Sequence, residues 1–307
     1  MIDIINLTKT YGKGKNLFYA NHNINFSISE GSVVAFLGAN GAGKTTLIKI
    51  ICNLISPTSG HVLFRGNDVA KNPRIAHENI GVVLEGARNL YNFLSIEENL
   101  SYFSLLNKLN KNDFIKRKQM LLDLFDLEAH KNKTVNQLSR GMQQKVAIMI
   151  AFLKNPDLLI LDEPTLGLDI ISQFSMKEAI KSFMKREKGV LIICTHDMSV
   201  VYDVCEDIAI FNKGQLKVYD KLNVLKISGN ESGFSVSMIN TQEVREFLQL
   251  NNINIIDNYD NVIEFRLNNL DLLFSSVDIE DIIKIEKCSK SIQDLMVDIA
   301  KEDLCLN

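Results

Sequence analysis

The glycine-rich stretch GANGAGKTT, which begins at Gly38, has the residues of a phosphate-binding loop. It follows a buried-strand pattern and opens a helical pattern, which is the context that a P-loop requires. Glycines let the backbone wrap closely around phosphate, and its N–H groups point inward with the positive end of the helix. We expect Lys44 to reach the β and γ phosphates and Thr45 to ligate Mg²⁺; the alternative is an ordinary turn. The predicted nucleotide contacts in this loop are Gly38, Ala39, Asn40, Gly41, Ala42, Gly43, Lys44, Thr45 and Thr46.

Two acids follow one another at the end of a second apolar run, DLLILDEP. Ligands gather at the carboxyl ends of parallel strands, and adjacent residues on a strand diverge. We therefore assign Asp162 to the hydrated Mg²⁺ and Glu163 to the attacking water. His196, in IICTHD, also ends an apolar run, where its ring could orient that water or contact the γ-phosphate. Lys44, Glu163 and His196 form the predicted catalytic set. The alternative for the two acids is a solvated pair that ends a strand, and the alternative for His196 is a structural histidine.

A third stretch, LSRGMQQKVAIMIAFL, places a Ser-x-Gly turn at the start of an apolar helix. Ser139 stands where an N-cap belongs, and Met142, Val146, Met149 and Leu153 mark the buried side of the predicted helix. The free N–H groups and the dipole at such a helix start can hold an anion. The alternative is a well-capped amphipathic helix without a ligand.

The elements that must position these residues alternate along the first two hundred residues. Short β-branched runs alternate with helical patterns, which predicts parallel strands with crossover helices. A mainly helical insertion interrupts this rhythm at about residues 94–153, and Ser95 and Glu98 have capping-box spacing at its start. After residue 224 the pattern changes to period-two runs around one short helix, which predicts a small α+β module over residues 225–307.

Composition excludes some classes of protein. The 307 residues have a formal net charge of −3 from well-mixed acids and bases, which gives no reason to expect nucleic acid as a partner. The five cysteines are scattered without C-x-x-C spacing, which suits a reducing compartment, so we expect a cytosolic protein. The longest apolar stretches are far shorter than the roughly 20 residues of a membrane span, and no export signal is visible.

Taken in order, GANGAGKTT, LSRGM, LLILDEP, GLD and CTHD resemble the nucleotide-binding subunits of ABC transporters over about residues 1–220. The resemblance implies an α/β P-loop NTPase core with a parallel sheet, an antiparallel β subdomain and the inserted helical subdomain, all within residues 1–224. It also implies an ATPase that uses ATP and Mg²⁺ and pairs head to tail with a second ATPase subunit, either another copy or a related chain. Ser139 and Gly141 would then contact the γ-phosphate of the ATP held by the opposite Lys44.

Further roles follow from the same resemblance. Tyr11, in KTYG, is similar to the aromatic residue that stacks on adenine, although a Tyr-Gly pair in an early hairpin is also a common turn. Asp169, in GLD, matches the loop that links the two nucleotide sites. Glu85 stands where most members carry a glutamine that touches the metal, and a carboxylate there could still ligate Mg²⁺. In the signature, Arg140 and Met142 replace the commoner Gly and Gln.

The partner implied by the resemblance is a separate transmembrane permease. The chain would then sit in the cytoplasm, peripheral to the inner face of the cell membrane. The departures in sequence and the added C-terminal module resemble the branch that exports drugs, antibiotics, peptides or polysaccharides, which is an inference by analogy. The alternatives are a soluble ABC-type ATPase acting on ribosomes or nucleic acid, and a P-loop kinase, for which the LSRGM loop would have no purpose.

Overall fold

The chain forms two compact units in the computed structural model, Met1–Leu222 (unit 1) and Asn223–Asn307 (unit 2). The structure describes residues 1–84, 90–186, 189–223, 233–251, 253, 255–259, 261–267, 270–274, 276–288 and 292–302. Over these residues, no helix is both long enough and apolar enough to span a bilayer.

A six-stranded sheet with the order β10-β9-β3-β8-β7-β6 forms the centre of unit 1. All neighbouring strands run parallel except β10, which is antiparallel to β9. β3, β7 and β8 are buried at every position, which is why their sequences are almost continuously apolar. The predicted parallel sheet is confirmed. The six strands are β3 (Val33–Leu37), β6 (Ile80–Val83), β7 (Leu158–Asp162), β8 (Val190–Cys194), β9 (Asp207–Asn212) and β10 (Gln215–Lys221).

A second, antiparallel sheet of unit 1 has the order β2-β1-β4-β5 and confirms the expected antiparallel subdomain. β1 and β2 form a hairpin across a 3₁₀ turn, η1 (Gly14–Asn16). Residues from both sheets share one hydrophobic core, in which Ile2 and Ile24 pack with Phe36 and Phe211. The strands are β1 (Ile2–Tyr11), β2 (Phe18–Ile28), β4 (Ser59–Phe64) and β5 (Asn67–Asp68).

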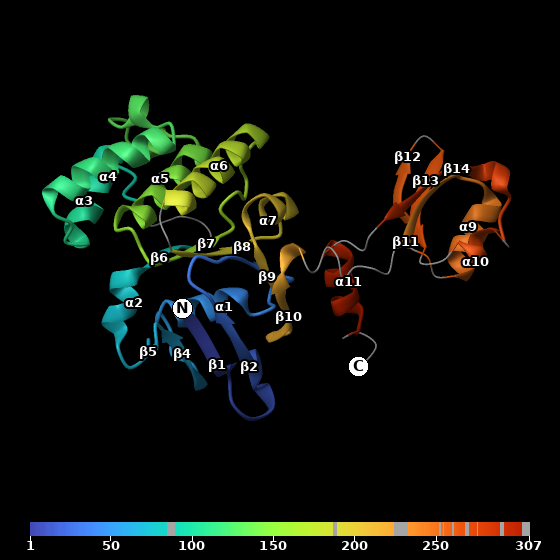
Figure 1. Cartoon of the computed structure of the whole chain (residues 1–307), viewed down its shortest axis with the longest axis horizontal. Helices are drawn as coiled ribbons and strands as arrows, with labels where there is room; N and C mark the ends of the chain where they lie inside the picture. The colour runs from blue at the N-terminus through green and yellow to red at the C-terminus, as the bar shows by residue number, and fades with distance from the viewer. Residues whose placement is uncertain are drawn as a thin grey trace. The chain divides into compact units, whose positions relative to one another are not determined.

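The predicted helical insertion is present as α3, α4 and α5, which lie together in Figure 1. α3 begins with the expected capping box: Ser95 Oγ accepts from the Glu98 N–H at 3.1 Å, and the Glu98 carboxylate accepts from the Ser95 N–H at 2.7 Å. The helices of unit 1 are α1 (Lys44–Ile51), α2 (Pro73–Asn79), α3 (Ile96–Leu106), α4 (Lys111–Leu124), α5 (Arg140–Leu153), α6 (Ile170–Arg186) and α7 (Met198–Val204), with 3₁₀ turns η2 (Glu128–His130) and η3 (Val135–Gln137).

Unit 2 is the α+β module that the sequence predicts after the first domain. Its antiparallel sheet has the order β12-β13-β11-β14, and its elements follow the β-α-β-β-α-β sequence of a split β-α-β fold. Val244 and Phe247 of its first helix pack on Val236, Ile263 and Phe265 of the sheet. The elements are β11 (Gly233–Ile239), α9 (Gln242–Leu250), β12 (Ile255–Tyr259), β13 (Val262–Leu267), α10 (Asp271–Phe274), η4 (Ile279–Asp281), β14 (Ile282–Cys288) and α11 (Ile292–Glu302).

Candidate functional site

Three of the predicted motifs meet at the carboxyl ends of neighbouring strands in the six-stranded sheet. In the sheet β8 lies between β3 and β7, and Cys194 at its end pairs with Phe36 on one side and Asp162 on the other. The glycine-rich loop follows β3, Glu163 follows β7 and His196 comes two residues after β8. Because parallel strands end at the same edge, the loop, the acids and the histidine are brought together there.

The backbone of the glycine-rich loop requires glycine at two positions. Gly38 has φ +146° and Gly43 has φ +99°, which side chains rarely adopt. A Cβ on Gly38 would lie 2.3 Å from the carbonyl oxygen of Phe211, and one on Gly43 would lie 2.2 Å from that of Ala20. The loop is thus pressed against neighbouring backbone, which fixes its shape before α1 begins at Lys44.

Replacement of Gly43 by alanine tests this packing, and Gly31→Ala is its matched control. Gly31 also has a positive φ, +80°, but a Cβ there would meet nothing within 4 Å. Both variants therefore carry the backbone strain, while only Gly43→Ala must also displace the Ala20 carbonyl, at a further cost of about 1–3 kcal/mol. We expect Gly43→Ala to unfold at lower denaturant and to bind a fluorescent ATP analogue at least about tenfold more weakly than Gly31→Ala. Equal behaviour of the two variants would contradict this account.

The Lys44 side chain lies along the same loop. Its Nζ donates to the carbonyl oxygens of Gly38 at 2.5 Å and Ala39 at 3.2 Å. A second contact comes from Asn21, whose fully buried side-chain amide donates to the carbonyl of Gly43 at 3.2 Å. Asn21 Oδ1 has no hydrogen-bond partner among the described residues. Asn21 is not predicted from the sequence, because nothing in the pattern of β2 marks a polar side chain as buried beneath the loop.

Glu163 is held between two side chains that follow β8. Its Oε1 lies 2.8 Å from Nδ1 of His196, and its Oε2 accepts from the Thr195 hydroxyl at 3.2 Å. The Glu163 side chain is 16% exposed and that of His196 is 70% exposed, so the carboxylate is sheltered while the ring faces solvent. Thr195 was also missed as a site residue, although it stands inside the quoted CTHD.

The backbone at Glu163 is in the left-handed region, with φ +50°, and its N–H donates to the carbonyl of Cys194 at 2.8 Å. This conformation is unusual for a residue other than glycine and turns the chain sharply after Asp162. The two adjacent acids therefore leave the strand differently: Asp162 is buried as the last residue of β7, while Glu163 reaches the end of β8. The divergence expected from the sequence is present.

The pKa of the Cys194 thiol is shifted by burial and by the charged side chains at these strand ends. Burial raises the pKa of Cys194 well above its usual range, and the negative charges of Asp162 and Glu163 raise it further, while the positive charge of Lys44 acts in the opposite direction. The thiol is therefore neutral, and all three charged side chains are near enough to act on it.

The LSRGM segment forms the helix start that the sequence predicts. Ser139 caps α5, its Oγ accepting from the Met142 N–H at 3.2 Å. Gly141 is buried, and a Cβ on it would lie 3.2 Å from the Ser172 hydroxyl of α6. Within the part of the chain that the structure describes, Ser139 makes no hydrogen bond to Lys44 or Glu163.

Asp169 lies just before α6 and holds its first turn. Its two carboxylate oxygens accept from the Ser172 N–H at 2.9 Å and from the Ser172 hydroxyl at 2.7 Å. Both hydrogen bonds lower the pKa of Asp169 below its usual value, and the one from the Ser172 N–H has the larger effect. Since Ser172 also lies against Gly141, the GLD loop and the LSRGM loop are neighbours.

Tyr11, another predicted site residue, takes part in none of the hydrogen bonds above. Tyr11 ends β1 opposite Phe18 in the hairpin; it is 46% exposed, and Lys9 Nζ lies 5.1 Å from the centre of its ring. An aromatic face in this position is accessible to a planar ligand. Glu85 lies outside the described residues.

Comparison with known proteins gives consistent matches. The ABC transporter family model matches residues 21–166. The chain is 34% identical over 216 residues to the ABC transporter ATP-binding protein NatA of Bacillus subtilis, covering 70% of this chain and 87% of NatA. It is also 34% identical over 216 residues to the bacitracin transport ATP-binding protein BcrA of Bacillus licheniformis, covering 70% and 68%. Other matching proteins have names that specify import, of Fe(3+) ions or of methionine.

A solved structure, the dimeric bacterial ABC transporter cassette MJ0796, matches with a TM-score of 0.65 and 31% identity. The match covers 72% of this chain and 99% of the cassette. The same cassette is known as a dimer in a post-hydrolysis state bound to ADP and Pi.

Proposed function

We propose a function on the premise that this chain belongs to the ABC transporter ATP-binding proteins, and so binds and hydrolyses ATP. In this proposal two such subunits, identical or related, close head to tail on two ATP molecules and drive a separate permease. The convergence of the glycine-rich loop, Asp162–Glu163 and His196 at the ends of β3, β7 and β8 carries the proposal. Residues 1–224 are the proposed ATPase domain, and residues 225–307 an accessory domain.

The described residues suit a triphosphate and its metal. Gly38 and Gly43 let the loop pack against neighbouring backbone, where a Cβ on either would clash, and Lys44 supplies a cation beside the loop. Thr45 and Asp162 offer a hydroxyl and a carboxylate, the oxygen ligands that Mg²⁺ prefers; Glu85 is a further proposed ligand. When bound, Mg²⁺ would neutralise charge on the phosphates.

The catalytic roles follow from the contacts at the strand ends. Glu163 is the proposed general base: its carboxylate is sheltered, fixed by Thr195 and placed next to His196. Nδ1 of His196 contacts one carboxylate oxygen of Glu163, which leaves Nε2 to accept a hydrogen bond from the attacking water or, when Nε2 carries a proton, to donate one to the γ-phosphate. Lys44 stabilises charge on the phosphates, and no covalent intermediate is needed, because phosphoryl transfer depends on positioning and charge.

The remaining contacts come from the hairpin and from the second subunit. Tyr11 is the proposed adenine platform, since its ring is half exposed at the end of β1. Ser139 and Gly141 are proposed to contact the γ-phosphate bound by the opposite subunit. The exposed Ser139 and the free N–H groups of α5 support this role. Asp169, through Ser172, connects that contact to α6.

Replacement of Ser139 by arginine tests the shared site. Arginine is larger than serine and carries a positive charge, so it should block closure over the partner's nucleotide. We expect ATP hydrolysis to fall at least about tenfold, while ATP binding changes less than about twofold. The measurements are phosphate release and titration with a fluorescent ATP analogue. Asn132→Arg, which adds the same charge at an exposed turn of the same subdomain, is the control. Loss of ATP binding in Ser139→Arg would place this serine in its own subunit's site instead.

The permease and the location at the inner face of the membrane are tested by affinity purification from detergent-solubilised membranes. The proposal expects a polytopic membrane protein to co-purify with the chain at a fixed ratio. Recovery of ribosomal proteins or nucleic acid instead would favour the soluble ATPase. Transport direction is proposed as export, by analogy with the exporting branch of the family that the sequence departures and the added unit 2 resemble, and is tested by following cargo across vesicles of known orientation.

A further inference from the structure

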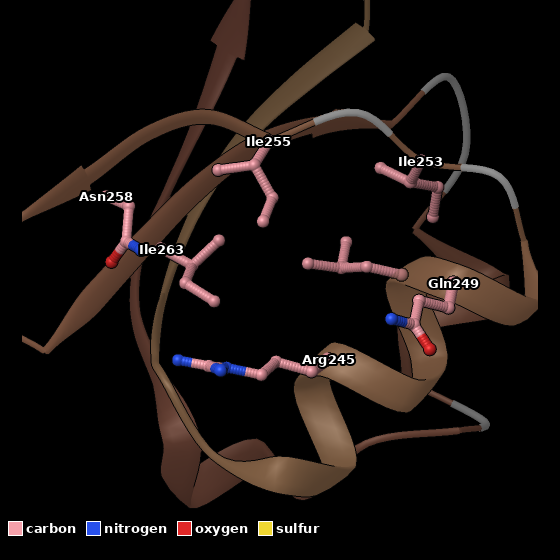
Figure 2. Close-up of a pocket in the computed structure, with 7 residues that line it drawn as sticks. Arg245, Gln249, Ile253, Ile255, Asn258 and Ile263 are labelled. Carbon is pink, nitrogen blue, oxygen red and sulfur yellow. The ribbon is translucent and has the colours of Figure 1, made fainter.

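Unit 2 contains a cavity of about 560 Å³ that the ATPase activity does not use. It lies between α9 and the sheet strands β12 and β13, and its volume is in the range of small-molecule sites. Figure 2 shows the Arg245 side chain extended across one side of this cavity toward Asn258 and Ile263, with Ile253 and Ile255 on the opposite side. The lining residues are Arg245, Leu248, Gln249, Ile253, Ile255, Asn258 and Ile263.

The cavity has an aliphatic wall made from three elements. Leu248 of α9 and Ile263 of β13 are buried in the core of unit 2 and form its base. Ile253 follows α9 and is tied back to it, its N–H donating to the carbonyl of Leu248 at 2.9 Å. Ile255 on β12 is 47% exposed at the edge. An apolar body entering the cavity would therefore remove side-chain surface from water, which is favourable.

An irregularity in β12 brings a polar group to the same wall. Ile255 pairs with Phe265 and Asn258 pairs with Ile263. An advance of three residues along β12 therefore matches an advance of only two along β13. This extra residue is a bulge, and it lets Ile255 and Asn258 both face the cavity, which strict alternation would prevent. A bulge of this kind re-aims side chains, and here it places an amide beside the aliphatic wall.

Arg245 supplies the charge of the cavity. Its Nε donates to Oδ1 of Asn240 at 2.6 Å, which fixes the side chain along one side of the cavity, with its terminal nitrogens near Asn258 and Ile263 (Figure 2). No ion pair to Arg245 is found among the described residues. The guanidinium presents a planar fork of donors that matches a carboxylate. Since Arg245 is the one cation among the described lining residues, a singly charged carboxylate is better matched than a doubly charged phosphate.

We propose that this cavity binds a small carboxylate with an aliphatic body. The carboxylate pairs with Arg245, the polar edge of Asn258 and Gln249 accommodates its remaining lone pairs, and the body lies against Leu248, Ile253, Ile255 and Ile263. The site lies within unit 2 and needs neither ATP nor a second subunit, so this inference stands apart from the proposed transport function.

The test uses the full chain and three probes: octanoate, 1-octanol and acetate. Octanoate has both the charge and the aliphatic body, while each of the others lacks one of them. We expect saturable binding of octanoate by calorimetric titration, at least about tenfold tighter than either of the other probes, because each loses one class of contact. No saturable octanoate binding up to about 1 mM, or equal binding of 1-octanol, overturns the proposal.

Variants then locate the site. Arg245→Gln should weaken octanoate at least about tenfold, and Ile255→Asn should weaken it by a similar factor without touching the charge. The control is Lys284→Gln, which removes a cation from β14 outside the cavity, where Lys284 pairs with Glu286. Unchanged affinity in Arg245→Gln, or an equal loss in Lys284→Gln, overturns the assignment. Arg245 and Ile255 are both substantially exposed, so thermal unfolding of these variants should match the parent chain.

Discussion

Replacement of Glu163 by glutamine is expected to reduce ATP hydrolysis by about 10²–10⁴-fold while leaving ATP binding intact. Glutamine keeps the size of the side chain and can still accept from the Thr195 hydroxyl, but it cannot take a proton from water. The left-handed backbone at this position should be kept, because the conformational energy at φ +50° is about the same for glutamine as for glutamate. Hydrolysis is followed by phosphate release, and binding by a fluorescent ATP analogue.

The same variant should accumulate as an ATP-dependent dimer, because closure over two nucleotides is no longer followed by hydrolysis. Size-exclusion chromatography with light scattering, with and without ATP and Mg²⁺, measures this. The matched control is Glu78→Gln, which removes a carboxylate paired with Arg74 on the surface of α2 and should behave like the parent chain. A Glu163→Gln protein that stays monomeric at saturating ATP and Mg²⁺ would argue against the two-subunit site.

Much of unit 1 could be predicted because its signals are local. A glycine-rich loop between an apolar run and a helix, and two acids at the end of another run, each carry their structural context in a few residues. The cap at Ser139 and the capping box at Ser95 are local as well, since each depends on residues within one helical turn. These features appear in the structure where the sequence places them.

The parts that could not be predicted depend on which strands become neighbours. The sequence could place His196 near the attacking water, because it follows an apolar run, but it could not show that Thr195 and His196 contact Glu163 directly. Those contacts depend on the position of β8 between β3 and β7, and periodicity says nothing of strand order. Asn21 shows the same limit: its burial follows from the approach of the loop to β2. In unit 2, the bulge that aims Asn258 depends on pairing with β13 and leaves no mark in the pattern of β12.

Replacement of Lys44 by alanine is expected to weaken ATP binding by about a hundredfold, and so to remove hydrolysis at ordinary ATP concentrations. The ammonium would contact two phosphates, and a hydrogen bond to a charged group contributes about 1.5–3 kcal/mol, or roughly one to two factors of ten. Its present acceptors, the carbonyls of Gly38 and Ala39, are partly exposed and can bind water instead, so stability should change little. ATP-analogue titration and denaturant unfolding measure the two effects.

Lys49→Ala is the control for this prediction, because it removes a lysine from the last turn of the same helix and should leave ATP binding unchanged. Comparison of Lys44→Ala with Ser139→Arg separates the two proposed roles, because both changes should reduce hydrolysis but for different reasons.

If Lys44 holds the subunit's own ATP and Ser139 closes over the partner's ATP, only Lys44→Ala loses nucleotide affinity. Adding Glu163→Gln to each then separates them further: neither double variant should dimerise, but only the one carrying Ser139→Arg should still bind ATP as a monomer. Equal loss of nucleotide in both would mean that the two residues serve one site within a single chain.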